Sequence, residues 1–447
     1  MFKTFINAWK IADIRKKLIF TGIIILLFRL GAAIPVPFVD ISTDGLLGSS
    51  SSTTFLDYIN LISGDAFNYG TIFAMSITPY INSSIIIQLL TVAIPALERL
   101  SKEGEEGRKK IASITRYTTV GLSLLQSTAY YVYLRSEDAL VVDADGNAYT
   151  GFAAVMQALV IIFMLTAGST LLMWMGEQIN DKGIGNGISI ILFAGIVARL
   201  PSIATYLYQQ FSYGGVYYPL VAIAVVILLL MVVFIVWMDN AERRIPVQYS
   251  KRVVGRKMYG GQSSYIPIKV NMSGVLPVIF ASSILSLPST IEMFIDVEEG
   301  SFWESFFNVF TTDHWAYCII YFFLIIFFGY FYSSIQYNPI EMANNLAKNG
   351  GTIPGVRIGR PTSDYIAKVL SKLVLLGSLL LSVVALFPIV YSQVTELIVT
   401  AVSETATDGV SISLGGTSII ILVGVALETV RQLESQMMMR HYKGFLD

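Results

Sequence analysis

Side chains that could carry out chemistry are few in this chain of 447 residues. The histidines are His314 and His441, and the one cysteine, Cys318, lies within an apolar run. There is no HExxH helix, Cys/His cluster or Walker motif, so the sequence offers no metal site and no phosphate loop. Serines are frequent in the apolar runs, but no base is available to activate one as a nucleophile. We therefore expect a protein that is not an enzyme, without catalytic residues, metal ligands or cofactor.

Charged residues inside the apolar runs are a second possible source of chemistry. Arg29 lies in the middle of the first run, Arg199 toward the outer end of the fifth, and Glu428 close to a helix end. A proton- or ion-coupled transporter usually has a relay of buried carboxylates, and three scattered charges do not form one. For Arg29, pairing with a backbone carbonyl or a neighbouring helix is a more common outcome than a functional role.

A cationic connection, residues 239–271, is too long to be a simple turn between two apolar runs. A few of its charges would suffice as a topology signal that keeps the loop cytoplasmic. Its length and excess of charge also favour a docking surface for an acidic or RNA-containing partner. The basic residues are Arg243, Arg244, Lys251, Arg252, Arg256, Lys257 and Lys269.

A second long connection, residues 337–368, is rich in glycine and proline and predicts a rigid finger. Arg357 and Arg360 lie at its tip.

The elements that position these loops are membrane spans, because 54% of the residues are hydrophobic and only 14% are charged. Lys and Arg gather in alternate connections, whereas connections 37–70, 295–314 and 393–410 contain none. By the positive-inside rule, both termini are cytoplasmic. We predict an all-α polytopic membrane protein with ten transmembrane helices, at 18–36, 71–95, 114–134, 152–175, 184–208, 216–238, 272–294, 315–336, 369–392 and 411–430.

The apolar segment 55–69 is not counted as a span. If it crossed the membrane, the basic stretch 99–110 would face outside and every later loop would have the wrong sign. The segment is also short and contains Asp57, Gly64 and Asp65. Two interpretations stay open: a half-length helix that enters from the outer face, which requires shelter by protein or water, and an external interfacial helix.

Seven stretches, in order along the chain, resemble the SecY family, the channel subunits of the bacterial protein-export translocon. They are ITPYINSSIIIQLL (77–90), EGEEGRKK (103–110), GEQINDKGIGNGISI (176–190), AERRIPVQYSKR (241–252), YIPIKVNMSGVLPVIFASS (265–283), PGVRIGRPT (354–362) and LGGTSIII (414–421).

The resemblance implies two five-helix inverted-repeat halves, 18–208 and 216–430, between a cytoplasmic segment 1–17 and a cytoplasmic tail 431–447. Segment 55–70 would be a re-entrant plug, with Ile62, Ser63, Gly64, Asp65, Ala66 and Phe67 at its centre. The constriction would be a ring of branched apolar side chains, which gates by dewetting. By motif match the ring comprises Ile81, Ile85, Leu192, Ile196, Ile279 and Ile421, with Leu192 in place of an isoleucine.

The same resemblance implies a lateral gate near Gln88, Ser282 and Ser283, and docking of the SecA motor or the ribosome on the two long loops. Arg256 and Lys257 would face ribosomal RNA, and Arg357 would couple to the motor. Further implied partners are the SecE and SecG subunits, signal peptides, unfolded preproteins and membrane lipid.

The expected function is a passive protein-conducting channel in the bacterial plasma membrane, which also releases transmembrane segments sideways into lipid. A secondary transporter of a small solute is the alternative, because inverted repeats and broken helices also fit that class.

Overall fold

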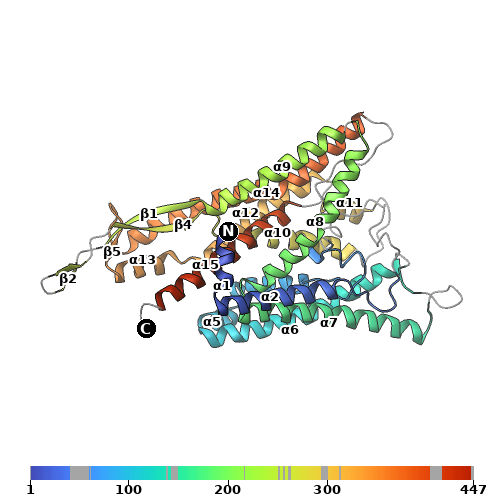
Figure 1. Cartoon of the computed structure of the whole chain (residues 1–447), viewed down its shortest axis with the longest axis horizontal. Helices are drawn as coiled ribbons and strands as arrows, with labels where there is room; N and C mark the ends of the chain where they lie inside the picture. The colour runs from blue at the N-terminus through green and yellow to red at the C-terminus, as the bar shows by residue number, and fades with distance from the viewer. Residues whose placement is uncertain are drawn as a thin grey trace. The chain divides into compact units, whose positions relative to one another are not determined.

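The computed structural model describes residues 2–40, 60, 62–136, 139–141, 149–215, 217–249, 252–254, 257–259, 263–292, 301–311, 314–402 and 415–443. Long helices account for most of these residues, and each of the ten predicted spans overlaps one of them (Figure 1). By length and apolar composition, six of the described helices can cross a membrane, or seven if one bent pair is a single span. The predicted helical, multi-pass membrane fold is confirmed, and the count of ten is consistent with these helices.

The chain forms two compact units. Unit 1 comprises Met1–Tyr213, Leu285–His314 and Val425–Asp447, and unit 2 comprises Gly214–Ile284 and Trp315–Gly424. Helices α10 (Leu276–Glu292) and α15 (Gly416–Lys443) contribute residues to both. The other helices of unit 1 are α1 (Phe2–Lys10), α2 (Ala12–Gly31), α4 (Thr78–Ala93), α5 (Pro95–Lys102), α6 (Glu105–Ser136), α7 (Phe152–Lys182), α8 (Gly187–Ser212) and α11 (Phe302–Asn308).

Within unit 1, α4 packs on α6 and α6 packs on α7. Small residues make these contacts close, as expected for helices in a membrane. The Ser83 hydroxyl of α4 donates to the carbonyl of Thr115 on α6 at 2.8 Å, and the hydroxyls of Ser123 and Ser169 join α6 to α7. Each of these hydroxyls thereby has a hydrogen-bond partner on the neighbouring helix.

A bend of 101° separates α4 from α5. Ile94 between them is extended, with φ −106° and ψ 113°, and Pro95 begins α5. The ring of a proline disfavours helical geometry at the residue before it, so the span ends here. Helix α5 has no fully buried residue, and its Lys102 pairs with Glu98 at 2.6 Å.

Unit 2 packs α14 against both α9 and α12 (Figure 1). The Tyr391 hydroxyl of α14 donates to the carbonyl of Leu220 on α9 at 2.6 Å. A β-carbon on Gly329 of α12 would lie 2.0 Å from the Ser378 hydroxyl oxygen of α14, so the two helices pack closely where Gly329 faces Ser378. The helices of unit 2 are α9 (Tyr217–Asn240), α12 (Trp315–Gln336), α13 (Pro339–Lys348) and α14 (Arg360–Val402).

Strands in unit 2 are the exception to the all-helical prediction. Ile245 and Val247 are buried while their neighbours Arg244, Pro246 and Gln248 are exposed, which is the alternation of a half-buried strand. β1 pairs antiparallel with β4 and with β5, and β2 pairs antiparallel with β3. The strands are β1 (Glu242–Tyr249), β2 (Arg252–Val254), β3 (Lys257–Tyr259), β4 (Ser263–Lys269) and β5 (Gly351–Thr352).

Candidate plug seat, pore-ring residues and docking surface

The described part of the predicted plug is a compact turn in unit 1. Asn60, Ile62 and Ser63 are helical, and residues 64–70 continue as turns. Gly64 and Asp65 both have left-handed backbone angles, with φ of +67° and +70°. Left-handed angles at two successive residues allow the sharp turn that a re-entrant segment would require.

Polar side chains of the turn satisfy its own backbone. The Asn60 side-chain oxygen accepts from the amide of Asn68 at 3.1 Å, and the Ser63 hydroxyl accepts from the amide of Phe67 at 3.0 Å. The Asn60 amide group also donates to the carboxylate of Asp65 at 3.2 Å. Because these bonds are local, the turn holds its shape without a regular helix.

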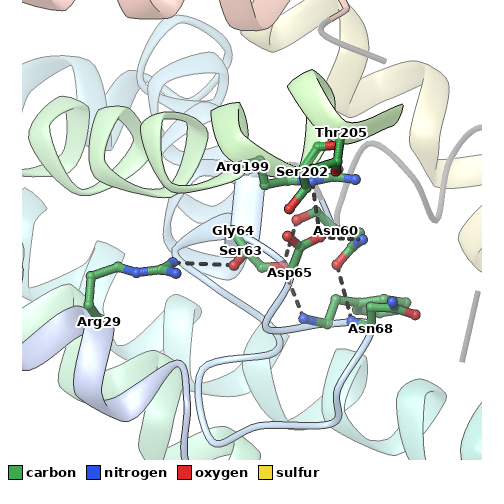
Figure 2. Close-up of polar contacts among 10 residues, drawn as sticks. Arg29, Asn60, Ser63, Gly64, Asp65, Asn68, Arg199, Ser202 and Thr205 are labelled. Atoms are coloured by element: carbon green, nitrogen blue, oxygen red, sulfur yellow. Dashed lines mark hydrogen bonds and ion pairs between the residues drawn. The ribbon is translucent and has the colours of Figure 1, made fainter. Parts of the chain in front are cut away.

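Two arginines contact the turn from different helices (Figure 2). Arg29 of α2 donates from Nη1 to the carbonyl of Gly64 at 3.3 Å. Arg199 of α8 forms an ion pair from Nε to the Asp65 carboxylate at 3.0 Å. The expected pairing of Arg29 with a backbone carbonyl is thus found, whereas the pairing of Arg199 was not expected from the sequence.

Below the polar turn, apolar side chains fill a core. Ile62, Ala66 and Phe67 are at most 4% exposed. The ring of Phe67 lies 4.6 Å from that of Tyr130 on α6, and the Tyr130 hydroxyl donates to the carbonyl of Phe67. Burial on this scale stabilises by about 1.5–3 kcal/mol for each large side chain. The seat of the plug is therefore mainly apolar.

The turn touches α8 at a glycine. A β-carbon on Gly195 would lie 2.5 Å from the carbonyl oxygen of Ile62. A backbone oxygen cannot be moved as easily as a side-chain end, so glycine is needed at this position. The Gly64 backbone is close to the same point, because a β-carbon there would lie 3.0 Å from the Gly195 carbonyl.

The predicted ring residues are divided between the units. Ile85 of α4 and Leu192 and Ile196 of α8 are buried in unit 1, and Ile81 is half-buried. In each helix the two members are four residues apart and share a face. Ile279 of α10 and Ile421 of α15 belong to unit 2 and are also buried. That the six converge on one axis stays a prediction.

The predicted gate residues are divided in the same way. Gln88 is exposed on α4 in unit 1. In unit 2, the Ser282 hydroxyl donates to the carbonyl of Ile279 at 2.9 Å and is buried, while Ser283 is half-buried. Their role as a gate stays a prediction.

The two long connections form one body in unit 2, which we call the docking body: β1, β4, β5, α13 and the first turns of α14 (Figure 1). Gln248 and Tyr249 of β1 pair with β5 of the other loop. Ile245, Leu346 and Ile366, one from each of three elements, are buried in its shared core. The strands of this body could have been predicted, because apolar and polar residues alternate in parts of 242–249 and 263–269.

Exposed arginines from both connections are carried by this body. Arg243, Arg357 and Arg360 are exposed. Arg244 is also exposed, but it pairs with Glu242 at 2.6 Å and lies 4.8 Å from the centre of the Tyr265 ring. The hydrogen bond to Glu242 raises the pKa of Arg244 above its ordinary value. Arg244 is therefore held in place, while the other three are available to a partner.

The remaining predicted docking residues belong to the middle of the first connection in sequence. Arg252 and Lys257 lie in the backbone pairs Arg252↔Tyr259 and Val254↔Lys257 of a short hairpin, and their side chains are outside the described part of the structure. Lys251 and Arg256 lie outside the described residues.

The described residues include no cluster of three or more His, Cys, Asp or Glu side chains that could hold a metal ion. Cys318 is buried in α12.

The arrangement of helices matches solved protein-conducting channels. One such channel superposes with a TM-score of 0.61 at 18% identity, covering 94% of this chain and 92% of the other. A second, a SecY structure described for the role of its plug domain in the closed state, gives 0.62 at 16% identity with the same coverage. The fold is thus that of a multi-pass protein-conducting channel.

Sequence comparison identifies the family. The SecY family model matches residues 71–430. The protein translocase subunit SecY of Corynebacterium glutamicum is 44% identical over 455 residues, covering 99% of both chains. That of Mycobacterium tuberculosis H37Rv is 42% identical over 464 residues, covering 100% of both. The chain belongs to the SecY family. The secondary-transporter alternative finds no support in these relatives.

Proposed function

We propose that this chain is the protein-conducting channel subunit of a protein translocase. It passes unfolded secretory proteins across the plasma membrane and releases transmembrane segments sideways into lipid. The observation that carries this proposal is the match to translocase subunits over the full length of the chain at 42–44% identity. The solved protein-conducting channels support it through the fold.

In the resting state, the plug turn and the ring residues close the channel. A ring of Ile81, Ile85, Leu192, Ile196, Ile279 and Ile421 offers no ligands to ions, and a dry constriction of this kind excludes water. Branched aliphatic side chains still deform around an extended polypeptide. Buried contacts of Ile62, Ala66 and Phe67 hold the plug until a substrate displaces it.

Sideways release takes place next to Gln88, Ser282 and Ser283. An apolar segment gains free energy when it moves from the aqueous path of transport into lipid. A polar chain remains in the pore, so the same opening sorts membrane segments from secreted ones.

Force for transport comes from a cytoplasmic partner that binds the docking body. The SecA motor and the ribosome are the proposed partners, and a related channel, Sec61, has been solved in a canine ribosome–channel complex. Exposed Arg243, Arg357 and Arg360, together with Arg256 and Lys257 of the first connection, supply positive charge for phosphate contacts. The channel itself hydrolyses nothing, binds no cofactor, and has both termini in the cytoplasm.

The proposed complex includes the subunits SecE and SecG. Membranes depleted of this chain test the function: export of a signal-bearing precursor should fall in proportion to the depletion and recover when the chain is restored. Export at the normal rate from depleted membranes contradicts the proposal.

A further inference from the structure

We propose that Asp65 and Arg199 form an ionic latch that holds the plug against α8, in addition to the apolar contacts. The inference rests on the proposed function, because the turn acts as a plug only in a channel. Asp65 Oδ1 lies 3.0 Å from Arg199 Nε, and the two side chains are 26% and 15% exposed (Figure 2). A pair this sheltered is screened less by salt than a surface pair.

The backbone conformation at Asp65 would suit glycine as well as aspartate. Its φ of +70° is in the left-handed region, where glycine has no steric cost and an aspartate has a modest one. Aspartate tolerates this region, and its carboxylate makes contacts that a glycine would lack. Its Oδ1 accepts a hydrogen bond from the Asn60 amide group at 3.2 Å and lies 3.0 Å from Arg199 Nε, in an ion pair without hydrogen-bond geometry.

Arg199 is on the part of α8 that the plug already touches. Gly195, one helical turn earlier, is the residue whose backbone approaches the carbonyl of Ile62. The ion pair and the close backbone contact therefore form together when the plug is seated and are lost together when it leaves. This makes the pair specific for the seated state.

Arg29, unlike Arg199, contacts the backbone of the plug turn and not a side chain. It reaches the carbonyl of Gly64, so it is independent of the side chain at position 65. Neutralising Asp65 removes the latch and leaves the Arg29 bond and the apolar seat in place. The expected effect is a plug that opens more often but still closes.

Alkylation of a buried cysteine tests the latch without requiring transport. The full chain, with Cys318→Ala to remove the native thiol, carries Ala66→Cys in the plug, where Ala66 is 1% exposed. Native membranes are treated with N-ethylmaleimide, and the alkylation rate is measured. Into this background we place Asp65→Asn, Arg199→Gln, both together, and Arg199→Lys.

Each single charge removal should raise the alkylation rate about fivefold, equivalent to about 1 kcal/mol. The double variant should match the singles, because both changes remove one interaction. Arg199→Lys keeps the charge and should remain within about twofold of the parent. As a matched control, Glu177→Gln breaks the 2.7 Å ion pair of Arg116 and Glu177 between α6 and α7, and the rate should not change.

Rates equal to the parent in both single variants would overturn the latch, as would a double variant whose effect is the product of the two. A cysteine at Ser127, buried between α6 and α7, should stay unreactive in every variant. Reactivity there would show general loosening of the unit and also overturn the latch. Failure of the proposed function would appear instead as undiminished export from depleted membranes.

Discussion

Gly195 offers a quantitative test of how the plug is seated. In Gly195→Ala the new β-carbon would lie 2.5 Å from the carbonyl oxygen of Ile62, so the plug turn must move away from α8. Overpacking of this kind costs about 1–3 kcal/mol. If the cost falls on the seated state alone, the ratio of released to seated plug rises about 5- to 150-fold.

The assay is leak of chloride from vesicles that contain the purified channel complex without motor or substrate. Gly195→Ala should leak faster than the parent by a factor in that range. Gly121→Ala is the matched control, because a β-carbon at Gly121 of α6 meets no atom within 4 Å. It makes the same chemical change within a helix and should leave the leak unchanged. Equal leak from both variants would refute the idea that Gly195 is needed for the plug to seat.

Three further predictions concern packing and docking. Gly168→Ala places a β-carbon 2.0 Å from the carbonyl of Ile72, so its thermal unfolding midpoint in detergent should fall well below that of Gly121→Ala. Ile245→Ala, in the docking-body core, should lower local stability by about 2–5 kcal/mol, seen as faster hydrogen exchange in β1 and β4 with unchanged exchange in α7. Arg357→Glu should weaken binding of the cytoplasmic motor, with the largest loss at low salt, and a loss that is equal at all salt concentrations would contradict an electrostatic contact.

Much of the fold could be predicted from the sequence, because a membrane imposes length, apolarity and charge asymmetry on every span. Arg29 shows that individual charges are also informative: an arginine within an apolar run must pair, and it does so with a backbone carbonyl. Glycines are less informative on their own. Gly121 and Gly195 look alike in sequence, and only the tertiary structure shows that one is free and the other is in contact.

Two features escaped prediction for physical reasons. The ion pair of Asp65 and Arg199 joins residues far apart in the chain, so no local pattern reveals it. The sheet of the docking body includes β5, a two-residue strand from the other connection that is too short to be recognised in the sequence. In the sequence, the alternating Ile245 and Val247 are surrounded by charged residues and do not stand out as a strand. The structure shows that both are buried in the core that the two connections share.

The central claim is that a polypeptide passes through the ring, and site-specific photocrosslinking to a secretory chain stalled in mid-export tests it most directly. Probes replace Ile81, Ile279 and Ile421 one at a time. Val225 and Leu229, which are 42% and 60% exposed on α9, are the controls. Strong adducts from the three isoleucines and none from the controls are predicted. Equal labelling at all five positions, or none at any, would contradict the channel account.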